Sequence, residues 1–249
     1  MKKVITSTLV AIFTIALLQA QNSELIIPEV YEVIKIKKPI KIDSNWDKKE
    51  WKKVKPVTIT NYIGDIPDFK PKVQAKMVYD NDNLYVIFRV DDKYVKSITD
   101  RNNGPVYRDS AVELFFASDV ENSLVYFNIE TNCGGKVLFN HNNPADRSKN
   151  IRFTDDDITQ LEIAHSMPNI VDPEITNEVT WTIEYKVPIA LLKKHAAVTT
   201  PAKGVEWRAN FYKIAEITSN PHYITWSKVE NRPRPNFHQP ENFGRIIFK

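Results

Sequence analysis

A stretch near the middle of the chain, residues 107–132, alternates between apolar and polar side chains with a period of two. Its sequence is YRDSAVELFFASDVENSLVYFNIETN. Apolar and aromatic residues recur at alternate positions over 111–117 and again over 124–130, and a polar segment, 118–123, separates the two runs. Side chains of a strand point alternately to opposite faces of a sheet, so this pattern predicts a β-hairpin with one buried face.

Carboxylate and amide groups gather on the other face of this hairpin. We expect Glu113, Glu130 and Asn132 to meet near one end of the strand pair, beside an exposed Tyr107. Such polar side chains are seldom core material, so they are either solvated or part of a site.

The rest of the chain also consists of short apolar runs separated by polar segments. Strands are expected at 28–42, 57–62, 73–79, 84–90, 136–140, 161–166, 180–187, 207–217, 223–227 and 245–248. Short helices are expected within 43–51 and over 189–196, and loops at 141–160 and 167–177. Many short strands with two peripheral helices predict an all-β fold, an antiparallel β-sandwich of the immunoglobulin or jelly-roll kind.

The first twenty residues have a different composition. A basic start at 1–3, an apolar run at 4–18 and a plausible cleavage end at Ala20 predict a secretory signal peptide over 1–20. A buried N-terminal helix is the alternative. The mature chain, 21–249, then has the size of a single sandwich domain, and we expect it to be secreted or periplasmic, without a membrane span.

Charge and cysteine content limit the partners and cross-links. The formal net charge is +3, with acidic and basic residues interspersed, so no basic stripe indicates a nucleic-acid partner, and we expect a monomer. The single cysteine, Cys133, excludes an intramolecular disulfide and is interpreted as a small packed residue at a strand end.

The sequence lacks the motifs of the common enzyme classes. Its five histidines show no HxH or HExxH spacing, and there is no G-x-S-x-G elbow, phosphate loop or dinucleotide fingerprint. Paired carboxylates are the one remaining route to catalysis, because Glu113 and Glu130 lie on neighbouring predicted strands, as the acid and base of a glycosidase would. A non-catalytic binding module is the favoured interpretation.

Five stretches, in order, resemble the motifs of the family 9 carbohydrate-binding modules and their family 9-like, DOMON-related relatives. They are IDSNWDKKEW at 42–51, VYDNDNLYV at 78–86, RDSAVELF at 108–115, WTIE at 181–184 followed by Pro188, and FHQPENFG at 237–244. The resemblance covers roughly residues 40–248 and implies a β-sandwich that holds a sugar end between two aromatic rings, often with structural calcium.

The resemblance also implies roles for particular residues. Tyr107 and Phe237 fall on the two aromatic walls, where sugar-binding members of the family carry tryptophan. Glu113 and Asn132 fall on the hydroxyl-binding carboxylate and amide, and Glu130 stands where the family can carry an arginine. Removing either ring is expected to abolish saccharide binding with little loss of stability. Further candidates from neighbouring segments are Tyr212, Arg234 and His238.

The expected function is therefore a secreted, non-catalytic module that recognises the ends of oligosaccharides or polysaccharides. One alternative is the haem-binding, electron-transfer version of the related sandwich, although Met77 and Met167 lie in no recognisable ligand motif. The other is a glycoside hydrolase that uses Glu113 and Glu130. The metal ligands are not identified, although Asp91 and Asp92 with neighbouring carbonyl groups could hold a calcium ion.

Overall fold

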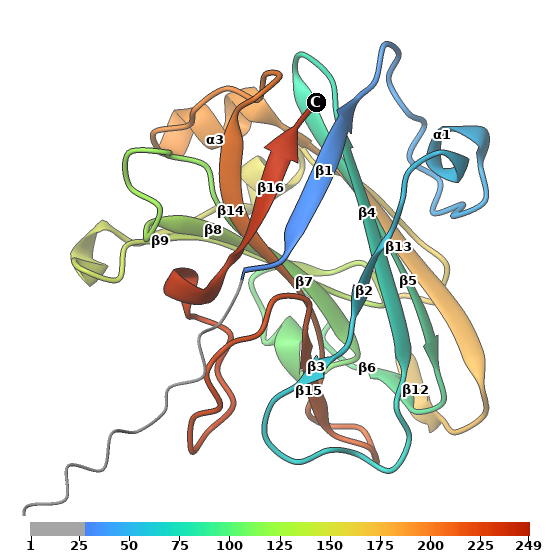
Figure 1. Cartoon of the computed structure of the whole chain (residues 1–249). Coiled ribbons are helices and arrows are strands. Elements are labelled where there is room, and N and C mark those ends of the chain that lie inside the picture. Colours follow the sequence, from blue (N-terminus) through green and yellow to red (C-terminus); the bar gives the residue numbers. More distant parts are fainter. Residues whose placement is uncertain (1–27) are drawn as a thin grey trace, which may run out of the picture.

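The computed structural model describes residues 28–249, and the predicted signal peptide, 1–20, lies outside the described residues. Two β-sheets pack face to face (Figure 1), so the predicted β-sandwich is confirmed. We call them the pocket sheet and the back sheet. The pocket sheet has the order β10 (Ile151–Arg152), β9 (Val137–Asn142), β8 (Tyr126–Asn132), β7 (Ala111–Ala117), β14 (Glu206–Ala215), β16 (Gly244–Phe248) and β1 (Val30–Lys35). In addition, β15 (His222–Thr225) pairs with β14, and β3 (Asn61–Tyr62) pairs with β15. The back sheet has the order β1, β4 (Lys72–Tyr79), β5 (Asn83–Asp92), β13 (Val179–Pro188) and β11 (Glu162–His165), with β2 (Val57–Ile59) beside β4.

Strand β1 joins the two sheets and is the exception to antiparallel pairing. Its first part, Val30–Val33, runs parallel to β16, and Ile34 and Lys35 then pair in parallel with β4. A separate small pair forms between β6 (Val95–Ser97) and β12 (Val171–Ile175).

The core lies between the two sheets and follows the predicted alternation. On β7 the side chains of Val112, Leu114 and Phe116 point into the main core, where the Phe116 ring stacks on Trp207 with centroids 5.7 Å apart. Burying an apolar side chain of this size contributes about 1.5–3 kcal/mol. Because these positions face inward, the intervening positions of β7 face outward, and Glu113 is one of them.

The hairpin and several connections differ in detail from the sequence prediction. The second hairpin strand, β8, begins at Tyr126 rather than at 124, because residues 118–125 form a longer turn. The segments expected as loops contain β10, β12 and the helix α2 (Asp155–Ile158). Helix α3 (Ile189–His195) matches its prediction, whereas α1 is confined to Lys49–Lys52.

Helix α1 starts later than expected because the residues before it are bound to the back sheet. The backbone N–H groups of Asp43 and Ser44 donate to the carboxylate of Glu184, at 2.9 and 2.8 Å, and the indole of Trp51 donates to the same carboxylate at 2.8 Å. The IDSNWDKKEW motif is therefore hydrogen-bonded to Glu184 of the back sheet. In the described part of the chain, no helix is long and apolar enough to cross a membrane.

Candidate functional site

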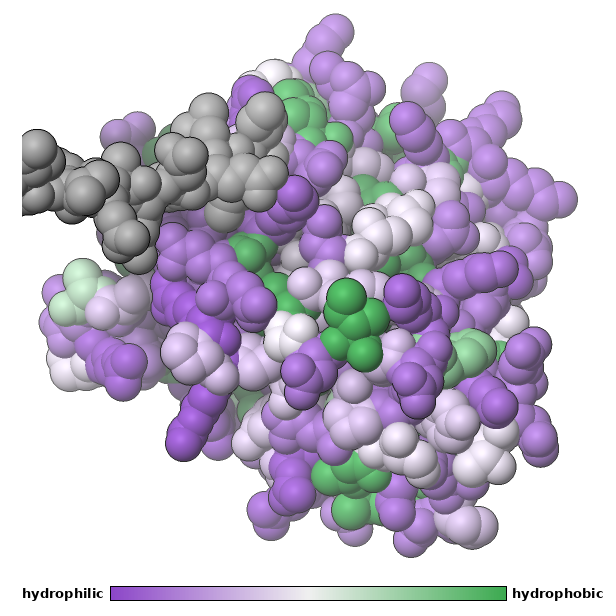
Figure 2. Space-filling model, turned by 60° about the horizontal axis from the view of Figure 1, so that its bottom comes forward, coloured by the Kyte–Doolittle hydropathy of each residue, from purple (hydrophilic) through white to green (hydrophobic). Residues whose placement is uncertain are grey.

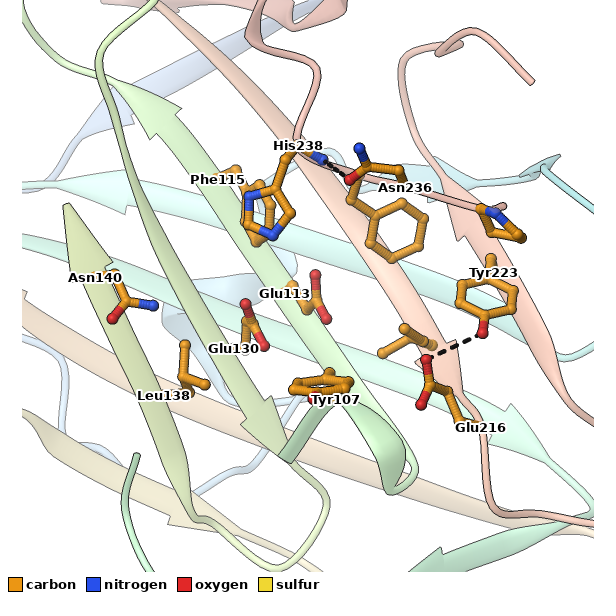
Figure 3. A pocket seen from close by; sticks show the side chains of 13 residues that line it. Tyr107, Glu113, Phe115, Glu130, Leu138, Asn140, Glu216, Tyr223, Asn236 and His238 are labelled. Carbon is orange, nitrogen blue, oxygen red and sulfur yellow. Dashed lines mark hydrogen bonds between the residues drawn. The ribbon is translucent and has the colours of Figure 1, made fainter. Parts of the chain in front are cut away.

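A pocket with a volume of about 280 Å³ opens on the outer face of the pocket sheet (Figure 3). This volume lies near the lower end of the range for small-molecule sites, about 300–1,000 Å³. Strands form its floor, and a short helix and a long loop form its walls. The lining residues are Tyr107, Glu113, Phe115, Glu130, Leu138, Asn140, Ile214, Glu216, Tyr223, Pro235, Asn236, Phe237 and His238.

Strand alternation places the polar groups of the floor. Glu113 of β7 is directly opposite Glu130 of β8, and Glu130 is opposite Leu138 of β9. Residues directly opposite one another on antiparallel strands share a face, so all three side chains point away from the core. The predicted convergence of Glu113 and Glu130 on one face is therefore present in the structure.

Tyr107 forms one wall from the short 3-10 helix η1 (Val106–Arg108), which leads into β7. Val106 is fully buried, and the carbonyl of Arg108 accepts the N–H groups of Glu216 and Ile217, both at 2.9 Å. These contacts tie the helix to the end of β14. Tyr107 itself is 38% exposed, so it presents its ring to solvent and to the pocket.

The opposite wall comes from the loop formed by residues 228–243, which joins β15 to β16. The buried amide of Gln239 holds this loop: it donates to the carbonyls of Glu230 and Asn236, at 3.0 and 2.8 Å. Its oxygen accepts the Glu230 N–H and the Asn242 amide, both at 3.0 Å. The FHQPENFG motif thus shapes the loop that delivers Phe237 and His238 to the pocket.

Phe237 lines the pocket but is only 5% exposed. Its ring stacks on Tyr212, with centroids 4.2 Å apart and an interplanar angle of 17°. The edge of Tyr223 lies against it, with the ring centroids 6.1 Å apart. One face of Phe237 is thus already covered by protein. The ring is part of a second apolar cluster on the outer face of the sheet, so we now expect its removal to lower stability, contrary to the expectation from sequence.

The two floor carboxyl groups have few partners. Glu130 Oε1 accepts a hydrogen bond from the Asn128 amide at 2.7 Å, and Asn142 in turn donates to Asn128 at 2.6 Å. Within the described chain, Glu130 Oε2 is buried without a partner. Burial raises the pKa of Glu130 to about 7, opposed by the Asn128 hydrogen bond and by Arg152. Burial, followed by the nearby charge of Glu130, raises the pKa of Glu113 well above its ordinary value.

The remaining polar groups of the rim are fixed by short contacts. Glu216 accepts a hydrogen bond from Tyr223 at 3.0 Å. The backbone N–H of His238 donates to the Asn236 side chain at 2.9 Å, and His238 Nδ1 lies 2.6 Å from the Tyr126 hydroxyl. Although much of His238 is open to solvent, desolvation of its ring, which packs against Phe115, lowers its pKa to about 4, so the imidazole is neutral at neutral pH.

Three of the predicted site residues do not reach the pocket. Asn132 is fully buried, and its amide donates to the Thr99 carbonyl at 3.0 Å and to Asp109 at 2.8 Å, so it is turned away from any ligand in the pocket. Tyr212 lies beneath Phe237 and is also fully buried. Arg234 is exposed on the 228–243 loop and does not line the pocket. Tyr107, Glu113, Glu130, Phe237 and His238 do line it.

Sequence reasoning missed several residues of the rim. Asn140 and Leu138 could have been found by continuing the alternation from the hairpin into the next strand. Glu216, Tyr223 and Asn236 carry no such signal, because strand pairing and the path of the 228–243 loop bring them to the pocket only in the folded chain.

The residues considered for metals and haem are engaged in other contacts. Asp92 is buried and accepts the Lys93 N–H at 2.8 Å, and Asp91 accepts the Thr180 hydroxyl at 2.7 Å. Within residues 28–249 no group of three or more histidine, cysteine or acidic side chains is placed to hold a metal ion. Met77 and Met167, like Cys133, pack in the apolar core.

The fold and pocket define a class of protein: a β-sandwich with a small pocket on the outer face of a sheet. Among known families, the model of "Carbohydrate-binding family 9" matches residues 39–248, and this chain belongs to that family. A search of curated proteins finds no match.

Three solved structures share the fold. A candidate carbohydrate-binding protein from Bacteroides uniformis is 20% identical, with a TM-score of 0.78 over 89% of this chain and 100% of that chain. A family 9 carbohydrate-binding module from Caldicellulosiruptor kristjanssonii in complex with cellotriose is 16% identical, with a TM-score of 0.60 over 89% and 94%. The same kind of module in complex with glucose gives the same identity and TM-score over 89% and 96%.

Proposed function

We propose that this protein is a secreted, non-catalytic module that binds the end of an oligosaccharide or polysaccharide in the pocket beside Tyr107. The observation that carries the proposal is the combination of an exposed aromatic ring with a polar floor in a pocket of about 280 Å³. Aromatic rings suit the C–H faces of a sugar ring, and convergent polar groups fix its hydroxyls. The family and the saccharide-bound neighbours support the same function.

The proposed stacking surface is unequal on the two sides. Tyr107, 38% exposed, offers a free ring for contact with a sugar face. Phe237 is held against Tyr212 and contributes a largely buried wall rather than a second open face. We therefore assign most of the stacking to Tyr107 and the shape of the far wall to Phe237.

A second hollow extends the pocket along the sheet. It has a volume of about 420 Å³ and shares Asn236 and His238 with the first. Its other lining residues are Tyr126, Asn142, Asn143, Pro144, Arg147, Asn150 and Arg232. Amide and guanidinium groups suit hydroxyl recognition, so the end unit of the glycan is proposed to occupy the first pocket while the next unit crosses the second.

The face shown in Figure 2 favours a polar ligand over a wide apolar partner. The face shown in Figure 2 is mostly hydrophilic, and its hydrophobic residues form small separate spots. Large protein-docking surfaces commonly show a contiguous apolar patch. A glycan, which is rich in hydroxyls, fits a surface of this kind better.

The acid–base properties of the floor argue against hydrolysis. A retaining glycosidase needs one carboxyl group that stays ionised as the nucleophile and a second that stays protonated as the acid. Here the pKa values of Glu113 and Glu130 are both raised, and within the described chain neither carboxyl group has a cation at hydrogen-bond distance. Hydrolysis of aryl glycosides by the purified protein, lost in Glu113→Gln, would reverse this assignment.

A glycan array followed by calorimetry tests the proposal. The mature wild-type protein is expected to bind saccharides, and Tyr107→Ala is expected to weaken binding about fivefold or more, since stacking on an aromatic ring contributes about 1–3 kcal/mol. The matched control is Tyr94→Ala, because Tyr94 packs on Phe69 away from the pocket. Absence of binding to every glycan by the wild type would refute the function. Secretion is tested separately, by sequencing the mature N-terminus, which is expected near Gln21.

A further inference from the structure

We propose that the pocket selects a saccharide whose end unit carries a free amine, with the ammonium group held between Glu113 and Glu130. This inference rests on the proposed function and names the class of sugar. It starts from the charges that line the pocket: Glu113, Glu130 and Glu216 are acidic, and no lysine or arginine is among the lining residues. A lining with three acidic groups and no lysine or arginine suits a ligand that brings a positive charge.

Of the two floor carboxyl groups, only oxygen Oε1 of Glu130 receives a hydrogen bond within residues 28–249. Glu113 and Glu130 are 2% and 5% exposed. Oxygen Oε2 of Glu130 is buried and unpartnered, and within the described chain the carboxyl group of Glu113 receives no hydrogen bond. Buried polar groups are nearly always paired, so an unpaired carboxyl oxygen on a residue that lines a pocket points to a group supplied by a ligand.

An ammonium group suits this gap better than a hydroxyl group does. It has three donors and a full positive charge, so it satisfies several carboxyl oxygens and also relieves the repulsion between the two glutamates. Neighbouring aromatic rings add a favourable interaction with a cation. Tyr107 and Tyr223 line the same pocket and supply such rings.

The cations already in the protein are engaged elsewhere. Lys213 points to the opposite face of β14, where its Nζ donates to the Ile214 carbonyl at 2.9 Å and lies 3.6 Å from Asp92. Arg152, on β10, uses its Nε to bond Asn140 at 3.2 Å. The charge of Lys213 lowers the pKa of Glu113, and that of Arg152 lowers the pKa of Glu130. In the described chain, however, neither cation forms an ion pair with Glu113 or Glu130.

A divalent cation fits the pocket less well. The third acidic group, Glu216, is already bound by Tyr223 at 3.0 Å and lies 4.0 Å from Arg108. Two carboxylates alone fall short of the six to eight oxygen ligands that calcium takes. An organic ammonium needs no such shell.

Three β-1,4-linked trimers that differ only in the substituent at C2 test the inference by calorimetry at pH 7 and low salt. They are the glucosamine trimer (ammonium), the N-acetylglucosamine trimer (acetamide) and cellotriose (hydroxyl). The glucosamine trimer is expected to bind at least about tenfold more tightly than the other two, since a hydrogen bond to a charged group contributes about 1.5–3 kcal/mol.

Substitutions locate the effect. Glu130→Gln, nearly equal in volume, is expected to remove the preference for the glucosamine trimer; Glu113→Gln serves as the second variant if the first is unstable. The control is Glu121→Gln, which changes net charge equally on the exposed turn at 118–125 and is expected to keep the preference. Persistence of the preference in both pocket variants would overturn the inference.

The remaining outcomes separate the two proposals. Equal affinity for the trimers, a preference for cellotriose, or glycan-array hits that lack an amine overturn the inference and leave the carbohydrate-binding proposal standing. Binding of calcium chloride alone that is lost in Glu130→Gln also overturns it. Failure of all trimers together with an empty glycan array overturns the proposed function itself.

Discussion

Glu113 on β7 and Glu130 on β8 are directly opposite one another in the hairpin, and both side chains end in the same pocket. Such residues have Cβ atoms about 4.5–5.5 Å apart, and like charges at these positions are destabilising. The only hydrogen bond to either carboxyl group within residues 28–249 comes from Asn128. The two carboxylates therefore destabilise the fold when both are ionised. Protonation, or a cationic group from a ligand, would remove this repulsion.

The first prediction concerns the dependence of stability on pH. Burial raises the pKa of Glu130 to about 7 in the folded chain, from about 4.5 when unfolded. The folded chain thus binds more protons between these values, so stability is lost as pH rises from about 4.5 to 7. At pH 8 we expect Glu130→Gln to be more stable than the wild type, by on the order of 3 kcal/mol in the free energy of unfolding.

Urea unfolding at several pH values measures this difference. The advantage of Glu130→Gln over the wild type is expected to shrink toward pH 4, where the wild-type carboxyl group is protonated. Glu121→Gln is the control, because it makes the same chemical change on an exposed side chain outside the pocket. A difference between Glu130→Gln and wild type that stays constant from pH 4 to pH 8 would contradict the prediction.

The second prediction uses the exposed wall of the pocket. Tyr107→Trp enlarges the stacking surface at a position that is 38% exposed and anchored through the burial of Val106. Saccharide affinity is expected to rise several-fold while the melting temperature stays within about 2 °C, since surface substitutions usually change stability by less than about 0.5 kcal/mol. Calorimetry measures the affinity, and thermal unfolding measures the melting temperature. A drop in affinity would exclude stacking on this ring.

The third prediction concerns the buried wall. Phe237→Ala removes a ring that stacks on Tyr212 at 4.2 Å, and such truncations cost about 3–5 kcal/mol. Both stability and saccharide binding are expected to fall. Phe237→Leu, which keeps much of the packing, separates the two effects: if it retains stability but loses binding, Phe237 contacts the ligand directly.

The fourth prediction concerns the loop that carries Phe237 and His238. Gln239→Ala removes four hydrogen bonds of about 2.8–3.0 Å and leaves buried backbone groups unpaired, at a cost of several kcal/mol. We expect faster proteolysis within residues 228–243 and weaker saccharide binding. The control is Arg234→Ala on the same loop, outside the pocket. Unchanged protection against protease would contradict the anchoring role.

The fifth prediction concerns the ion pair of Lys213 and Asp92, whose side chains are completely buried. Lys213→Met leaves the carboxylate of Asp92 without its counter-charge, which typically costs about 3–5 kcal/mol. Lys213→Met combined with Asp92→Asn should recover much of that loss, because the oxygen of the introduced amide can still accept the Lys93 N–H. A double-mutant cycle by urea unfolding measures the recovery; strict additivity would argue against the pair.

Alternation alone predicted much of the fold. The runs at 111–117 and 180–187 contain inward-facing apolar residues on a clear period of two, and both became strands of the sandwich. The short strands β6, β10 and β12 were missed, because two- to five-residue strands in polar segments carry too little periodicity. Their formation depends on neighbours that are distant in sequence.

The sequence by itself determined that Glu113 and Glu130 share a face, because side-chain direction along a strand is a local property of the backbone. Only the tertiary structure decided what that face became. The 228–243 loop, anchored by Gln239, walls the two carboxyl groups in and buries them. The same packing turned Asn132 inward to Asp109 and pressed Phe237 onto Tyr212. The burial of a side chain and its hydrogen-bond partners depend on contacts between residues that are distant in sequence. In this pocket those contacts leave two carboxyl groups close together, and within the described chain they share a single hydrogen-bond donor.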